Sequence, residues 1–275
     1  MTRRILLHIG SPKCGSTYLQ QVLLQNSDRL AAQGVAYPHD GGGHPGNAAD
    51  LADVTQEKLD SWFAGDIHTV ILSHEDLYSL AKRGDTLAGL TTGTDIDVQL
   101  ICFLRPFSEF IYGDYSQFMK QFFDVFLAKR KPYDGRDFKA FAQRRIDTMK
   151  PAAYLRQWQQ RFPNLPLILD GHRNIRAVMT GLLGAPLADA LDWEVDSNRV
   201  NRSLRMEDCD RIAAAMRDPN VPDEDIKQMF HAAFHHVGDS DAGKTEERTA
   251  WVEAQFAPQN ATLLEEFNFD NRRKP

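Results

Sequence analysis

The sequence predicts an α/β fold of three layers, with a mostly parallel central sheet flanked by helices. Two observations support this class. Short apolar segments rich in β-branched residues are typical of buried strands, and they occur at 5–9, 68–73, 97–104 and 167–169. Segments with apolar residues at helical spacing lie between them, and such alternation is typical of parallel sheets.

Helices are expected where apolar residues recur three or four positions apart, at 16–30, 47–63, 108–126, 154–162 and 251–267. In the first of them, Leu19, Val22 and Leu23 share one face, and Gly34 follows its end. Residues 35–38 are predicted to be a short extended segment. The next residues, with three consecutive glycines, are predicted to form a loop.

Composition and charge bound the fold and exclude two classes of partner. A chain of 275 residues suits one domain, which we expect to cover 1–275. The net charge of −6 and the pI near 5.8 argue against nucleic acid and anionic membranes as partners.

No apolar segment approaches the ~20 residues that span a membrane. The first apolar run ends at Gly10, which is too short for an export signal. Three cysteines without metal-binding spacing favour a reducing compartment, so we expect a cytoplasmic protein.

The loop between the first strand and the first helix has the features of an anion-binding site. Gly10 and Gly15 are separated as in phosphate-binding loops, and Thr17 stands where those loops carry a hydroxyl. The N–H groups of such a loop and its helix converge on one point, which binds phosphate or sulfate. Ser16 occupies the usual lysine position, whereas Lys13 lies inside the loop. This displacement indicates a different transferred group and no metal ion.

The segment 12–20, PKCGSTYLQ, resembles the PKxG[ST]T-aromatic-LQ loop of the sulfotransferases. That family transfers a sulfuryl group from 3′-phosphoadenosine-5′-phosphosulfate (PAPS) to a hydroxyl or an amine. Weaker resemblances to bacterial members follow in the family's order, among them the aromatic pattern at 154–162 and the helix at 260–267. The resemblance implies a P-loop-NTPase-like fold and a bacterial PAPS-dependent sulfotransferase.

The resemblance also implies which residues bind the donor. Arg105 follows the third strand, and its planar fork suits the 3′-phosphate. The family's serine on the next helix is replaced by Gly113, and Ser116, one turn further, is the expected substitute. The segment 199–204 resembles an R-x-N-x-S-L element. The expected donor-binding residues are Pro12, Lys13, Cys14, Gly15, Ser16, Thr17, Tyr18, Arg105, Ser116, Arg199, Asn201 and Ser203.

Two titratable residues directly follow the strand at 68–73. Ligands of open parallel sheets bind beyond the carboxyl ends of strands, so His74 and Glu75 are candidates for the general base. The resemblance favours Glu75, because bacterial sulfotransferases often have S-x-E here. The alternative is that Glu75 only stabilises a helix N-terminus. His44, in the glycine-rich loop, is a candidate contact for the acceptor.

The expected reaction is in-line displacement at sulfur. Lys13 neutralises the leaving group, Glu75 or His74 takes the proton of the acceptor, and 3′-phosphoadenosine-5′-phosphate is released. The acceptor is expected to be a carbohydrate, such as a glycan, or a small metabolite; the sequence sets neither its identity nor the oligomeric state. One alternative is a P-loop nucleotide-dependent kinase. Another is a degenerate, non-catalytic nucleotide-binding homologue, which Gly113 motivates.

The helix at 108–126 and the segment after it carry two further patterns. Aromatic and apolar residues form a stripe that is predicted to be core, at Phe110, Ile111, Tyr115, Phe118, Phe122 and Phe123. Basic residues follow, at Lys129, Arg130, Lys131, Arg136, Lys139, Arg144 and Arg145. They are predicted to form a solvated face, with attraction of an anionic acceptor or donor as the alternative.

Overall fold

The computed structural model describes residues 3–196 and 203–273. The chain divides into two compact units. Unit 1 contains residues 1–105, 150–200 and 263–269, and unit 2 contains 106–149, 201–262 and 270–275. The expectation of one domain over 1–275 stays a prediction. The two units are described separately below.

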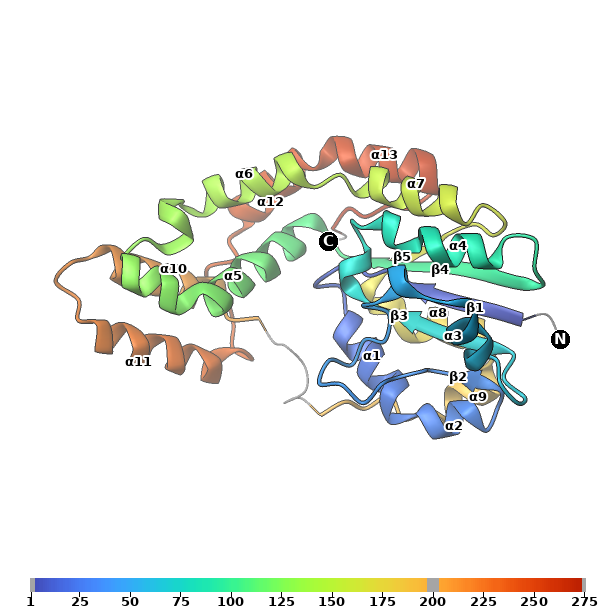
Figure 1. The fold of residues 1–275 in the computed structure, drawn as a ribbon. Helices are drawn as coiled ribbons and strands as arrows, with labels where there is room; N and C mark the ends of the chain where they lie inside the picture. The colour runs from blue at the N-terminus through green and yellow to red at the C-terminus, as the bar shows by residue number, and fades with distance from the viewer. Residues whose placement is uncertain (1–2, 197–202, 274–275) are drawn as a thin grey trace. The chain divides into compact units, whose positions relative to one another are not determined.

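Unit 1 is built on a sheet of five parallel strands in the order β2-β3-β1-β4-β5 (Figure 1). The strands are β1 Arg3–His8, β2 Val35–Ala36, β3 Thr69–Ser73, β4 Ile96–Leu104 and β5 Ile168–Gly171. In the register, His8 lies opposite Ser73 on β3 and Ile101 on β4. The predicted α/β class with a parallel central sheet is therefore confirmed.

Helices cover both faces of this sheet. On one face, Leu6, Ile71 and Phe103 pack in a single apolar cluster with α1, α2, α8 and α9. Those helices are α1 Ser16–Gln25, α2 Ser27–Ala31, α8 Ile175–Leu183 and α9 Ala185–Ala190. On the other side lie α4 and α7 (Figure 1), where the buried Trp158 indole donates to Leu77 O (2.9 Å). The remaining elements of this unit are η1 Leu51–Asp53, α3 Gln56–Trp62, η2 Glu75–Leu77, η3 Ala81–Gly84, α4 Asp85–Thr91, α7 Pro151–Arg161 and η5 His172–Asn174.

The predicted helix over 16–30 is two helices. Asn26 separates α1 from α2 with φ −106° and ψ 12°. Its side-chain amide donates to Val22 O and to Asp192 O, both at 2.8 Å. These bonds compete with the helical ladder, as polar side chains of this type do, and they end α1.

The predicted helix over 47–63 is wrong in its first half. The segment contains the short η1 and then a new helix, α3, which Thr55 caps by accepting from the Lys58 N–H (3.2 Å). A threonine at this position starts a helix rather than continuing one, because its hydroxyl satisfies an N–H of the first turn.

Unit 2 is helical in its described residues. Its elements are α5 Phe107–Lys129, η4 Pro132–Gly135, α6 Phe138–Thr148, α10 Met206–Arg217, α11 Asp223–Ala233, η7 Phe234–His236, α12 Glu246–Gln255 and most of α13 Ala257–Phe267. Aromatic pairs hold these helices together. Tyr115 stacks on Tyr133 with ring centroids 3.9 Å apart, and Phe123 stacks on Phe230 at 3.8 Å. The predicted helix over 251–267 is again two helices, α12 and α13.

The three cysteines, all within the described residues, are buried and form no disulfide. Cys14 follows β1, Cys102 lies on β4, and Cys209 lies on α10. Burial raises the pKa of the Cys102 and Cys209 thiols well above the ordinary value, so both stay protonated at neutral pH. None of the helices in the described ranges is long and apolar enough to cross a lipid bilayer.

Candidate functional site

The loop between β1 and α1 is fastened to the neighbouring strand β4. Ser11 N–H donates to Phe103 O (3.2 Å), and Phe103 N–H donates to Gly10 O (3.0 Å). Gly10 has φ +105°, and a Cβ added to it would lie 2.9 Å from Glu75 O. Glycine is therefore required here, both for the positive φ and for the close approach to the segment after β3.

The start of α1 presents backbone N–H groups that lack a backbone acceptor in the described part of the chain. They belong to Gly15, Ser16 and Thr17, as expected for a helical first turn. Gly15 has φ +87°, and the Ser16 hydroxyl donates back to Ser11 O (3.1 Å), which closes the loop. Together with the helix dipole, these N–H groups favour an anion at this point.

The other predicted loop residues differ in exposure. Pro12, Lys13 and Thr17 are partly exposed, and Lys13 has φ +61°. Cys14 is buried, with Sγ 3.6 Å from Ser11 Oγ. The Tyr18 hydroxyl donates to Trp193 O (3.0 Å), so Tyr18 ties α1 to the segment after α9. Among these residues, Lys13 is the cation that the loop supplies.

Glu75, directly beyond β3, is held by two side chains from other segments. Gln20 Nε2, on α1, donates to Glu75 Oε2 at 2.9 Å, and His44 Nε2 lies 3.3 Å from Oε1. The His44 ring stacks on His74, with centroids 4.8 Å apart. The structure thus brings together three predicted site residues, His44, His74 and Glu75, beside the loop.

Hydrogen bonds decide where the two imidazoles carry their protons. Asp76 N–H donates to His74 Nδ1 (3.2 Å), and Gly46 N–H donates to His44 Nδ1 (3.0 Å). A neutral ring that accepts at Nδ1 has its proton on Nε2, so both rings are N–H donors there. Burial lowers the pKa of His74, which keeps it neutral. His74 therefore donates rather than accepts, and His44 donates to Glu75.

Glu75 is ionised at neutral pH. Burial alone raises the pKa of this carboxyl, but the hydrogen bond from Gln20, its own N–H and the nearby imidazoles outweigh burial. The net effect holds the pKa of Glu75 below its usual value. A carboxylate has about four lone-pair sites. Because two side chains donate to it among the described residues, lone pairs remain on Glu75 to accept a proton.

A buried polar network behind Glu75 was not predicted. Ser73 Oγ accepts from Gln20 Nε2 (3.2 Å) and bonds to His8 Nδ1 (2.7 Å). Burial lowers the pKa of His8 to about 4, so its ring is neutral. Asn47 joins by accepting the Ser73 N–H at 2.8 Å, which fixes the end of the His44 loop against β3. The sequence could have indicated this network, because β1 ends in the polar residue His8 and β3 ends in Ser73.

Arg105 follows β4 directly, on the strand next to β1. Its Nε is buried and has no hydrogen-bond partner among the described residues. A buried guanidinium atom without a partner is costly, and a phosphate oxygen is the acceptor that suits it. This orphaned donor fits the predicted role of Arg105 in holding the 3′-phosphate of the donor.

The remaining predicted donor-binding residues belong to unit 2 or lie outside the described residues. Ser116 belongs to unit 2, where it is fully buried and accepts the Leu204 N–H (2.7 Å), a structural role. Ser203, also of unit 2, is exposed. Arg199 and Asn201 lie outside the described residues. The contacts expected of this set stay predictions.

Within the described ranges, no group of three or more histidine, cysteine, aspartate or glutamate side chains is placed to hold a metal ion. No known protein-family model matches the chain, and no curated protein matches it.

Proposed function

We propose that this chain is a PAPS-dependent sulfotransferase acting on a hydroxyl or amine acceptor. One observation carries the proposal: α1 begins with N–H groups that have no backbone acceptor among the described residues, and Gln20 of the same helix donates to the ionised carboxylate of Glu75, just beyond β3. An anion-binding loop next to a proton acceptor is what transfer of an anionic group to a hydroxyl requires. The resemblance of 12–20 to the sulfotransferase loop favours sulfuryl over phosphoryl transfer.

In this proposal the loop and Arg105 bind the donor. The N–H groups of Gly15, Ser16 and Thr17 hold the 5′-phosphosulfate, which is the reactive sulfuryl donor, and Arg105 Nε holds the 3′-phosphate. Lys13 neutralises the charge left on the phosphate oxygen when its bond to sulfur breaks. The displaced lysine thus does what magnesium and the usual lysine do in kinases.

Glu75 takes the proton of the acceptor as the new bond to sulfur forms. Gln20 and His44 orient the carboxylate, and His74 supports His44 through its stacked ring. The acceptor class proposed is a carbohydrate or a small metabolite. Cysteines that form no disulfide in the described residues fit a reducing compartment such as the cytoplasm.

Calorimetric titration of the full chain with 3′-phosphoadenosine-5′-phosphate, in the presence of a chelator, tests donor binding. Saturable binding supports the proposal, and magnesium-dependent turnover of ATP without such binding would establish the kinase alternative. Incubation with sulfur-labelled PAPS and a panel of sugars and metabolites then tests transfer. Binding without transfer to any acceptor would favour the non-catalytic alternative.

Lys13→Ala should reduce the transfer rate by about 10²–10³, the typical loss when one group stabilising a developing charge is removed. The matched control is Lys82→Ala, since Lys82 is an exposed lysine of the same unit on η3. Equal rates in the two variants would show that Lys13 is not the neutralising cation.

A further inference from the structure

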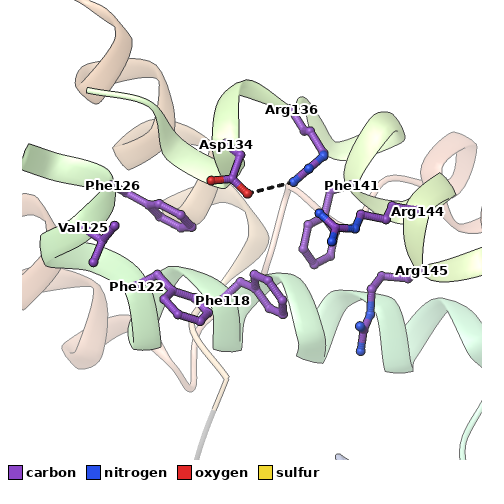
Figure 2. Close-up of a pocket in the computed structure, with 9 residues that line it drawn as sticks. All are labelled: Phe118, Phe122, Val125, Phe126, Asp134, Arg136, Phe141, Arg144 and Arg145. Carbon is purple, nitrogen blue, oxygen red and sulfur yellow. Dashed lines mark hydrogen bonds and ion pairs between the residues drawn. The ribbon is translucent and has the colours of Figure 1, made fainter. Parts of the chain in front are cut away.

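Unit 2 contains a cavity of about 320 Å³ between α5, η4 and α6 (Figure 2). Its apolar wall consists of Phe118, Phe122, Val125 and Phe126 from α5, with Phe141 from α6. Small-molecule sites have volumes from roughly 300 Å³ upward and are lined mainly by apolar and aromatic side chains. The cavity therefore has the size and lining of a site for a small molecule.

Two segments with unusual backbone angles border this cavity. Inside α5, Phe122 has non-helical angles, φ −115° and ψ 15°, so the helix is kinked where its aromatic residues face the cavity. Across from it, Tyr133 and Asp134 of η4 both have positive φ, 51° and 55°. Such conformations cost energy in residues other than glycine, and Asp134 is one of the residues that line the cavity.

The predicted core stripe is incomplete here. Phe118 and Phe122 are only half-buried, and Val125 is 47% exposed. Their rings already contact other aromatic rings, with Phe118 edge-on to Phe141 at 5.1 Å. The prediction that these two phenylalanines lie in the core is not met in full, because both are only partly buried and both line the cavity. The Arg145 guanidinium lies over the Phe118 ring, 5.9 Å from its centroid, so a ligand here would meet aromatic surface beside a cation.

The rim of the cavity carries three arginines and one aspartate. Arg136 pairs with Asp134 (3.1 Å), and Arg145 pairs with the buried Asp114 (2.6 Å). Arg144 is exposed and has no hydrogen bond or ion pair from its side chain among the described residues. After these pairings one positive charge remains at the mouth, on a chain whose net charge is negative.

We propose that this cavity binds a small organic anion with a flat apolar body and one carboxylate. The body packs between the phenylalanine rings, and the carboxylate pairs with the guanidinium of Arg144, whose fork suits that geometry. The body has about the size of two fused rings, since a cavity of 150 Å³ accommodates one benzene. The site lies wholly within unit 2 and does not depend on the proposed sulfuryl transfer.

The test is calorimetric titration of the full chain with naphthoate, a bicyclic carboxylate, and with naphthylmethanol, its uncharged analogue. Naphthoate should bind about tenfold more tightly, the ratio expected from one charge-assisted contact. Arg144→Gln should remove that advantage while leaving the alcohol unaffected. Lys129→Gln is the control, because Lys129 is an exposed cation of the same unit that does not line the cavity.

A second variant tests the cavity itself. Val125→Trp places a large ring in the mouth from an exposed position, so the fold should persist, as circular dichroism would show, while binding of both compounds is lost. Equal affinities for the acid and the alcohol, or unchanged binding in Val125→Trp, would overturn the proposal. So would sedimentation showing a dimer that Val125→Asp dissociates, since the occupant would then be a second copy of this chain.

Discussion

Glu75 is an ionised carboxylate held by Gln20 and His44, and it is the member of its cluster that still has lone pairs to offer. Glu75→Gln keeps the shape and removes the proton acceptor. Turnover in the proposed transfer should fall by about 10²–10⁴, the usual contribution of a general base. The affinity for 3′-phosphoadenosine-5′-phosphate should stay within about twofold.

The pH dependence of turnover distinguishes a general base at Glu75 from a residue with only a structural role. Because the pKa of Glu75 lies below its usual value, turnover should stay constant as the pH falls from neutral and decline only below the ordinary carboxylate range, near 4.3. His74→Asn should leave this acid limb unchanged, since His74 donates rather than accepts. Loss of the limb in His74→Asn, with Glu75→Gln fully active, would reverse the assignment.

His8, in the buried network behind Glu75, makes the free energy of unfolding depend on pH. Its pKa is about 4 in the folded chain against 6.5 for the free side chain, so the unfolded state binds more protons between these values. The contribution is complete above pH 6.5 and is lost as the pH falls through 4. This histidine should remove about 3 kcal/mol of unfolding free energy over that interval.

Urea denaturation at several pH values measures this effect. His8→Asn removes the titrating ring and should flatten the decline between 6.5 and 4, even if stability is lower throughout. His235→Asn changes an exposed histidine and should leave the decline as it is. An identical slope in the wild type and His8→Asn would exclude His8 as its source.

At the scale of elements, the loop before α1 depends on glycine at a position where no side chain fits. Gly10→Ala would place Cβ 2.9 Å from Glu75 O at φ +105°. It should lower the unfolding free energy by more than about 1 kcal/mol and weaken bisphosphate binding, because the loop must move away from β3. Denaturation and calorimetry measure the two effects.

The matched control is a glycine in an ordinary helix. Gly89 lies exposed within α4, and a Cβ there meets nothing within 4 Å. Gly89→Ala should stabilise the chain by about 0.5–1 kcal/mol, because alanine loses less backbone freedom in a helix. If both substitutions had the same sign, the strain assigned to the loop would be absent.

Strands were predictable from the sequence, and helix ends less so. β1, β3, β4 and β5 each contain a short apolar run, a signal that lies within the segment. The end of α1 at Asn26 depends on a hydrogen bond to Asp192, which is distant in sequence. No local pattern contains that information, so the helix over 16–30 was predicted to be too long.

In the candidate site, too, only features with a signal local in sequence were predictable. Its loop and Glu75 were predictable, because a glycine-bearing turn and a strand end are local features. Gln20 was part of the loop motif without a role, since its partners Ser73 and Glu75 lie far along the chain. Phe122 was assigned to the core because helical periodicity assumes a straight helix, and α5 is kinked there.

For the molecule as a whole, the proposed function predicts stabilisation by ligand. A compound that binds only the folded chain raises its unfolding free energy by about 2.7 kcal/mol at 100 times its dissociation constant. 3′-Phosphoadenosine-5′-phosphate should do so for the wild type and much less for Arg105→Gln. Adenosine 5′-phosphate, which lacks the 3′-phosphate, should hardly distinguish the two proteins. Urea titrations with each compound provide the measurement.

The buried cysteines allow the local or global unfolding of each unit to be measured. A thiol reagent attacks only the thiolate, which Cys102 and Cys209 do not form while enclosed. Alkylation must therefore wait for local or global unfolding. Since Cys102 belongs to unit 1 and Cys209 to unit 2, peptide mapping after timed alkylation reports how often each unit opens, without any attached label.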